Sequence, residues 1–225
     1  MTWPEIKNEL DRTSHESDSV STLLNSPRFW ESDESAIFGT ASFLYETGKS
    51  AECLRVIDAV RLRGRALSPK TDMEFRYLRG DALHGIEDYP EAVAVYGEII
   101  AIEPSDIAFG NRALAQWELG NYQEALNDYL EAVRLNPKNT VAHRGVGEML
   151  IKLDRPHDAV RYLTVAVNLD SEYAAAYTAL GVAYYNSGDW LKSYQALKTA
   201  VELAPDDRIA AKGIAKIERH FEMEN

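Results

Sequence analysis

The sequence has little cysteine and a shortage of basic residues, and each of these excludes a class of protein. A single cysteine, Cys53, in 225 residues cannot support a disulfide framework, so we expect a reducing compartment. The 24 lysines and arginines are outnumbered by 36 aspartates and glutamates, which gives a net charge of −12. This acidic balance disfavours nucleic acid or an anionic membrane as the main partner, since both need a basic surface.

Long apolar runs are also absent. The longest stretch without a charged residue is too short and too polar to cross a bilayer, so we expect no membrane insertion. The first ten residues lack the basic and apolar regions of a signal peptide. Together these features predict a soluble cytoplasmic protein.

The chain does contain an internal repeat. When the chain is aligned with itself at a shift of about 34 residues, similar residues fall into five aligned columns. The columns are Gly80, Ala113, Gly147 and Gly181; Ala92, Ala125, Ala159 and Ser193; Tyr96, Tyr129, Leu163 and Leu197; Ile99, Ala132, Ala166 and Ala200; Pro104, Pro137, Ser171 and Pro205. Each column has the same spacings of 33, 34 and 34 residues. A shared register across five columns indicates a repeat architecture.

These columns resemble the tetratricopeptide repeat, most clearly in Tyr177-x-x-Leu180-Gly181-x-x-Tyr184. The resemblance implies an all-α fold in which each repeat is a pair of antiparallel helices, A and B. Stacked pairs form a right-handed superhelical solenoid whose A helices line a concave groove. Four repeats are predicted at 73–105, 106–139, 140–173 and 174–207.

Degenerate or capping segments are expected on both sides of these repeats. Residues 34–72 carry a weaker repeat copy with an insertion, read as a lengthened second helix and a loop. Residues 208–225 are predicted to form a capping helix with Asp207 as its N-cap and an apolar face of Ile209, Ala210, Ile214, Ile217 and Phe221.

The N-terminal segment 1–33 is predicted to be partly helical and partly irregular. We expect a helix over about 3–12, a loop over Asp11–Thr22, and a short helix from Ser26-Pro27. Two interpretations stay open: a cap over the first repeat, or a mobile arm that folds into the groove or onto a partner.

A basic cluster marks the insertion: Arg55, Arg61, Arg63, Arg65 and Lys70. Such a cluster is usually a solvated face with ion pairs to neighbouring acids. The alternative is a docking site for a phosphate or an acidic segment, including another copy of this acidic chain.

No residue pattern indicates catalysis. None of the five histidines, His15, His84, His143, His157 and His220, shows the spacing of a zinc helix, and we expect no metal and no cofactor. Gly145-x-Gly147 lies inside a predicted helix and not at a dinucleotide-binding turn. Cys53 takes the place of a small alanine, so we expect a buried apolar role. The protein is therefore predicted not to be an enzyme.

The repeat register predicts which side chains face the groove. The candidate partner-binding residues are Tyr45, Tyr77, Asp81, His84, Asn111, Leu114, Trp117, Arg144, Glu148, Ile151, Thr178, Val182 and Tyr185. Aromatic and large apolar side chains at open positions are typical of interaction hot spots. Within the core, Tyr184 is expected to fill the space between helix pairs.

The predicted function is a protein–protein interaction scaffold that holds a peptide or a partner helix in the groove. Tetratricopeptide domains that bind chaperone tails use a carboxylate clamp of Lys, Asn and Arg residues. The matching positions here are Tyr77, Asp81, Asn111, Val141 and Gly145, and of these Asn111 alone fits the clamp. A chaperone for secreted proteins and a regulatory subunit of an enzyme complex remain alternatives, and a homo-oligomer stays open.

Overall fold

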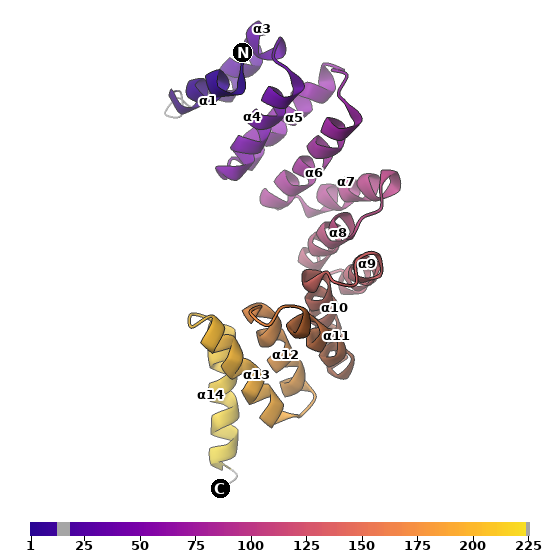
Figure 1. Ribbon diagram of the computed structural model, residues 1–225, viewed down its shortest axis with the longest axis vertical. Coiled ribbons are helices and arrows are strands. Elements are labelled where there is room, and N and C mark those ends of the chain that lie inside the picture. The colour runs from indigo at the N-terminus through magenta and orange to yellow at the C-terminus, as the bar shows by residue number, and fades with distance from the viewer. Residues whose placement is uncertain (13–18, 224–225) are drawn as a thin grey trace. The chain divides into compact units, whose positions relative to one another are not determined.

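The structure is a computed structural model that describes residues 1–12 and 19–223. Over these residues the chain forms fourteen α-helices and no β-strand (Figure 1), so the all-α prediction is confirmed. The chain divides into two compact units, Met1–Pro104 and Ser105–Asn225. The division falls between the first and the second of the four predicted regular repeats.

Unit 1 begins with three short helices that precede two helix pairs. Its helices are α1 (Trp3–Arg12), α2 (Ser19–Asn25), α3 (Pro27–Trp30), α4 (Glu34–Glu46), α5 (Ser50–Leu62), α6 (Pro69–Gly85) and α7 (Tyr89–Ile102). Helix α4 packs on α5 and α6 packs on α7, which gives two A–B pairs.

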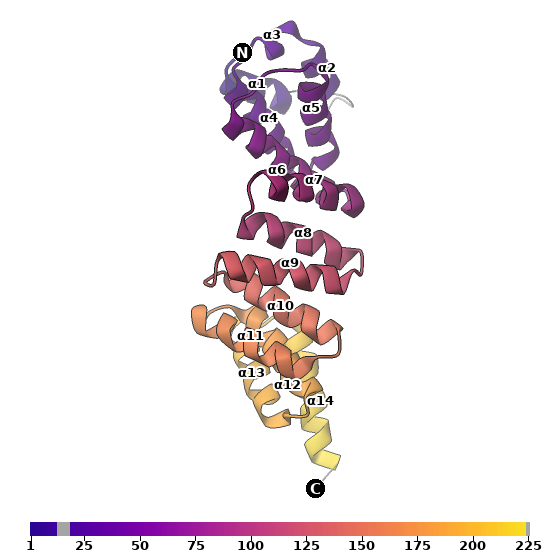
Figure 2. The same ribbon diagram turned by 90° about the vertical axis from the view of Figure 1, so that its right-hand side faces the viewer.

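Unit 2 contains three helix pairs and a final helix. Its helices are α8 (Asp106–Glu118), α9 (Tyr122–Leu135), α10 (Thr140–Lys152), α11 (Pro156–Leu169), α12 (Ala174–Asn186), α13 (Trp190–Leu203) and α14 (Arg208–Met223). Successive helices pack against each other, as the neighbouring ribbons of α8, α9 and α10 show in Figure 2.

One backbone feature recurs at the turn between helices A and B. A residue with a left-handed conformation stands there in each of five pairs: Gly48 (φ 77°), Glu87 (64°), Gly120 (77°), Asp154 (57°) and Gly188 (83°). Glycine adopts this conformation without strain, whereas side chains disfavour it. From Glu87 onward these positions have the spacings of the sequence columns, 33, 34 and 34 residues, which supports the predicted register.

In the pairs α10–α11 and α12–α13 a large side chain of helix B meets a glycine of helix A. A methyl group built on Gly147 would lie 2.4 Å from Cγ of Leu163, and one on Gly181 would lie 2.5 Å from Leu197. Leu163 and Leu197 are fully buried. These contacts explain why the glycine column and the leucine column share a register. Tyr184 is half-buried and packs against the core of unit 2, so its predicted packing role is supported although its side chain is not fully enclosed.

The N-terminal segment packs as a cap on unit 1. Ile6 and Leu10 of α1 are buried and α1 contacts α4. The helices at 3–12 and from Pro27 are confirmed. The loop predicted over Asp11–Thr22 is wrong at its end, because α2 begins at Ser19; residues 13–18, with His15, lie outside the described residues.

The basic insertion holds this cap in place. The Arg65 guanidinium donates to the carbonyl oxygens of Trp30 at 2.7 Å and Ser32 at 2.5 Å, and Arg63 stacks over the Trp30 ring. Helix α5 ends at Leu62, so a lengthened second helix is wrong: the extra residues form a loop and extend the start of α6. The cap interpretation of segment 1–33 agrees with these contacts.

Helix α14 ends unit 2 as predicted, with Asp207 as its N-cap. The Asp207 carboxylate accepts from the backbone N–H groups of Ile209 at 2.8 Å and Ala210 at 3.0 Å. The predicted apolar face is only partly correct. Ala210 and Ile217 are fully buried, whereas Ile209 is 64% exposed and Phe221 is 42% exposed.

Candidate functional site

A groove in unit 2 follows helices α8, α10 and α12 and has a volume of about 490 Å³. Its lining comes mostly from these A helices, with further residues from α9 and the start of α14: Leu114, Trp117, Tyr129, Arg144, Glu148, Met149, Ile151, Lys152, Ala175, Thr178, Ala179, Val182, Asp207 and Ile209. The majority of these side chains are apolar. The groove therefore suits a ligand with apolar side chains.

Helix geometry explains why these residues share one wall. On each A helix they stand three or four positions apart, as in Leu114 and Trp117 on α8 or Glu148 and Ile151 on α10, and such residues lie on one helix face. Leu114 is 37% exposed, and Trp117 is half-buried against the core of unit 2. The groove thus presents apolar side chains that are partly exposed to a ligand, and one of them, Trp117, also packs against the core of unit 2.

A polar network crosses the middle of the groove. Arg144 donates from Nη1 to Glu148 Oε1 at 2.5 Å and from Nε to the Tyr173 hydroxyl at 2.6 Å. Burial alone would lower the pKa of Arg144, but the negative charge of Glu148 and the Tyr173 contact outweigh it and raise the pKa. Arg144 therefore stays charged in the groove wall.

A second polar contact joins α12 to the last helix. The Thr178 hydroxyl donates to Asp207 Oδ2 at 2.5 Å. Burial alone would raise the pKa of Asp207, but this bond and the backbone N–H groups outweigh it, so the pKa is lowered. Asp207 is therefore ionised, and its carboxylate is bonded to Thr178 and to the start of α14. The Thr178 hydroxyl donates its hydrogen to Asp207 and is not available as a donor to a ligand.

A smaller pocket of about 320 Å³ adjoins the groove. It is lined by Val182, Tyr185, Asn186, Leu197, Ile209, Lys212, Gly213 and Lys216. Val182 and Ile209 line both hollows, which makes the pocket a continuation of the groove toward α14.

The structure brings together eight of the thirteen candidate partner-binding residues. Seven line the groove, namely Leu114, Trp117, Arg144, Glu148, Ile151, Thr178 and Val182, and Tyr185 lines the adjoining pocket. Asn111 lies on α8 but lines neither hollow. The sequence reasoning missed Lys152, Lys212, Lys216 and Ile209, of which the last three belong to α14, outside the repeat register.

The four candidates of unit 1 lie elsewhere and have other contacts. The Tyr96 hydroxyl donates to Asp81 at 2.5 Å, and the His84 ring packs edge-on against Tyr89. Burial raises the pKa of Tyr45, and the charge of Asp81 raises it further. Tyr77 on α6 is half-buried. That these four residues bind a partner stays a prediction.

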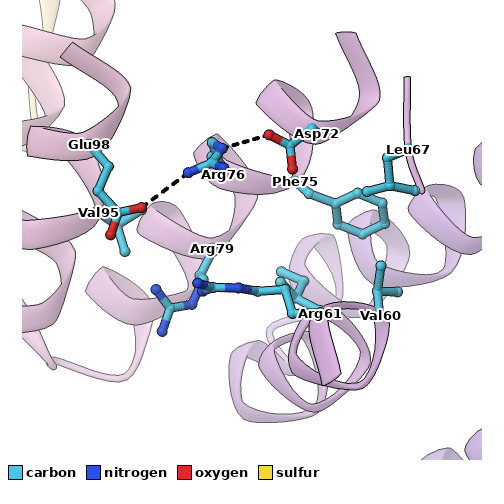
Figure 3. A pocket seen from close by; sticks show the side chains of 10 residues that line it. Val60, Arg61, Leu67, Asp72, Phe75, Arg76, Arg79, Val95 and Glu98 are labelled. Carbon is cyan, nitrogen blue, oxygen red and sulfur yellow. Dashed lines mark hydrogen bonds and ion pairs between the residues drawn. The ribbon is translucent and has the colours of Figure 1, made fainter. Parts of the chain in front are cut away.

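Arg61, Arg76 and Arg79 line a small hollow whose other lining residues come from α5, α6, α7 and Leu67 (Figure 3). Its volume is about 40 Å³, which is room for about two or three water molecules. Arg76 bridges Asp72 at 2.7 Å and Glu98 at 3.1 Å, and Arg79 pairs with Glu91 at 3.1 Å. Since the hollow is this small and its arginines Arg76 and Arg79 are engaged in ion pairs, it supports no ligand site.

Two features that could indicate catalysis are a reactive cysteine and a cluster of metal ligands. Cys53 is fully buried, and burial raises its pKa to about 12, so the buried role predicted for it is confirmed. Within residues 1–12 and 19–223 no group of three or more His, Cys, Asp or Glu could hold a metal ion. In the same part of the chain, no helix has the length and apolar character that a bilayer crossing requires.

Known proteins resemble this chain in sequence. Family models described as tetratricopeptide repeat match residues 107–139 and 174–207. The TPR repeat-containing thioredoxin TTL4 of Arabidopsis thaliana is 31% identical over 103 residues, which is 45% of this chain and 15% of that protein. The chain spans well under half the length of the first curated relatives that it matches.

Solved structures resemble it in fold. YrrB, described as a TPR protein with an unusual peptide-binding site, aligns with a TM-score of 0.63 and 21% identity over 80% of this chain and 91% of YrrB. The first TPR of Spaghetti (RPAP3), bound to an HSP90 peptide, aligns with a TM-score of 0.51 and 20% identity over 52% of this chain and 93% of that one. The repeated columns, the helix pairs and these matches agree, and the chain contains tetratricopeptide repeats, matched at residues 107–139 and 174–207.

Proposed function

We propose that unit 2 binds a segment of a partner protein, as an extended peptide or a helix, in the groove along α8, α10 and α12. One observation carries the proposal: Leu114, Trp117, Ile151 and Val182 line a hollow of about 490 Å³ beside the charged pair Arg144–Glu148. Apolar anchors beside a few fixed polar groups are the usual composition of a binding site. Tetratricopeptide repeats are in general non-catalytic interaction modules, which supports a binding role.

The structural relatives support peptide binding and leave the partner open. YrrB is described as having a peptide-binding site, and the RPAP3 domain holds an HSP90 peptide. A carboxylate clamp for chaperone tails is disfavoured here, because Tyr77, Asp81, Val141 and Gly145 stand where its Lys, Asn and Arg residues are needed. A role as a chaperone for secreted proteins, a role as a regulatory subunit, and the cytoplasmic location stay predictions.

A matched pair of leucines tests the groove. Leu114 lines it and is 37% exposed, whereas Leu135 is 38% exposed at the end of α9 and lines neither hollow. Leu114→Ala is expected to weaken capture of the native partner by about 1–2 kcal/mol, because it truncates an apolar anchor. Leu135→Ala is expected to leave capture within about 0.5 kcal/mol of the parent protein. Capture is measured by immobilising the full chain and quantifying the native partner that it retains from its native lysate.

Folding is followed in parallel so that lost capture is not mistaken for unfolding. Both variants are expected to keep the far-UV circular dichroism spectrum and the melting temperature of the parent, because both leucines are partly exposed. Equal capture by the two variants would contradict the groove as the binding site and direct attention to the candidates in unit 1.

A further inference from the structure

Helix α14 brings two lysines to the groove, and neither has an acidic partner. Lys212 and Lys216 stand one helical turn apart and line the adjoining pocket. Neither forms an ion pair or a hydrogen bond to any residue that the structure describes. Lys216 Nζ lies 5.9 Å from the centre of the Tyr185 ring. Both lysines are exposed residues.

The charge of the two hollows differs in sign from that of the whole chain. Their cations are Arg144, Lys152, Lys212 and Lys216, and their anions are Glu148 and Asp207. Both carboxylates are occupied, Glu148 by Arg144 and Asp207 by Thr178 and the start of α14. In a chain of net charge −12, this groove therefore presents a local excess of positive charge.

Apolar surface lies beside the lysines. Ile209 is 64% exposed and lines both hollows, next to Val182, and Tyr185 forms the wall of the pocket. A ligand that covers this surface removes apolar area from water and places its neighbouring groups near the lysines. Unpaired cations beside an apolar pocket select a ligand that has both an apolar side chain and a carboxylate.

We infer that the partner segment is acidic as well as apolar, with a bulky apolar side chain at Val182 and Ile209 and carboxylates at Lys212 and Lys216. The inference rests on the proposed function and specifies its partner. It gives α14 a second role, because the helix that caps the repeats also supplies the charge that the ligand needs. The partner is a separate protein with an acidic–apolar segment.

The test uses the purified full chain and fluorescein-labelled peptides. A library of short peptides with equal shares of acidic and basic residues is selected on the chain. The tightest peptide is then compared with a copy in which Gln and Asn replace Glu and Asp. We expect the amide copy to bind about tenfold more weakly, and added salt to weaken the acidic peptide most, because exposed charges are screened.

Variants of matched charge assign the effect to the groove. Lys212→Glu with Lys216→Glu is expected to weaken the acidic peptide by at least about tenfold, because attraction becomes repulsion. Lys138→Glu with Lys198→Glu makes the same change in net charge at exposed positions outside both hollows, and about twofold or less is expected. All four lysines are exposed, and circular dichroism checks that each variant is folded.

The outcomes separate this inference from the proposed function. Equal binding of the acidic and amide peptides, or equal binding by the two double variants, overturns the inference and leaves the groove as an apolar binding site. If no peptide is selected and Leu114→Ala leaves partner capture unchanged, the proposed function is overturned with it. If the chain self-associates in sedimentation and only Lys212→Glu with Lys216→Glu prevents this, the occupant is a second copy and the separate partner is wrong.

Discussion

Replacing Gly147 by leucine is expected to lower the free energy of unfolding by about 1–3 kcal/mol, the usual cost of overpacking a core. A first added carbon alone would lie 2.4 Å from Cγ of Leu163. Leu163 is fully buried, so its side chain has no free space to move into. Urea denaturation followed by circular dichroism measures the loss.

Gly110 provides the control for this prediction. It also lies inside an A helix, but a carbon built on it would have no neighbour within 4 Å. Gly110→Leu is expected to raise the free energy of unfolding by about 0.5–1 kcal/mol, because glycine is a poor helix former. The same glycine-to-leucine substitution is thus expected to change the free energy of unfolding in opposite directions at the two sites. Equal effects would show that the packing of α10 against α11 is misassigned.

Replacing Asp128 by alanine is expected to cost about 2–3 kcal/mol of the free energy of unfolding. Asp128 on α9 is buried and accepts two hydrogen bonds from Arg112 on α8, at 2.6 Å and 2.8 Å. Removing the carboxylate leaves a largely buried guanidinium without its counterion, which is strongly destabilising. The Arg112 side chain is 25% exposed, and we therefore expect a loss below the largest values known for such pairs.

Asp158 serves as the comparison. It pairs with Arg155 at 2.7 Å, but the two side chains are 44% and 53% exposed. Asp158→Ala is expected to cost no more than about 0.5–1 kcal/mol, since water screens exposed pairs. Thermal and urea denaturation of both variants checks the difference. Similar losses at the two positions would mean that the Arg112–Asp128 pair does not stabilise the α8–α9 contact.

The repeats could be predicted because their contacts are local. Gly147 meets Leu163 within one repeat, and the same contact returns as Gly181 with Leu197. A contact that recurs at fixed spacing leaves a trace in the sequence, and the predicted register therefore gave the right helix pairs. The helix face that carries Leu114 and Trp117 could be predicted from the repeat spacing as well, because helix geometry fixes which residues share a face.

Features outside the repeat could not be predicted in this way. Arg65 binds carbonyl oxygens 33 and 35 residues earlier in the chain, through a loop that has no counterpart in the other repeats. Lys212 and Lys216 reach the groove because of how α14 packs on α12 and α13, and the repeat columns contain no information on that helix. Asp81 shares a column with groove residues, but the Tyr96 hydroxyl binds it.

Tryptophan NMR signals test directly whether the groove of unit 2 is the partner-binding surface. The chain has four tryptophans, and of these only Trp117 lines the groove. In a two-dimensional spectrum of the labelled chain, titration with the selected acidic–apolar peptide is expected to shift the indole N–H signal of Trp117. The signals of Trp3 and Trp30, both in unit 1, are expected to stay in place. An unmoved Trp117 signal at saturating peptide, with shifts at Trp3 or Trp30, would show that the peptide binds in unit 1 and not in the groove of unit 2.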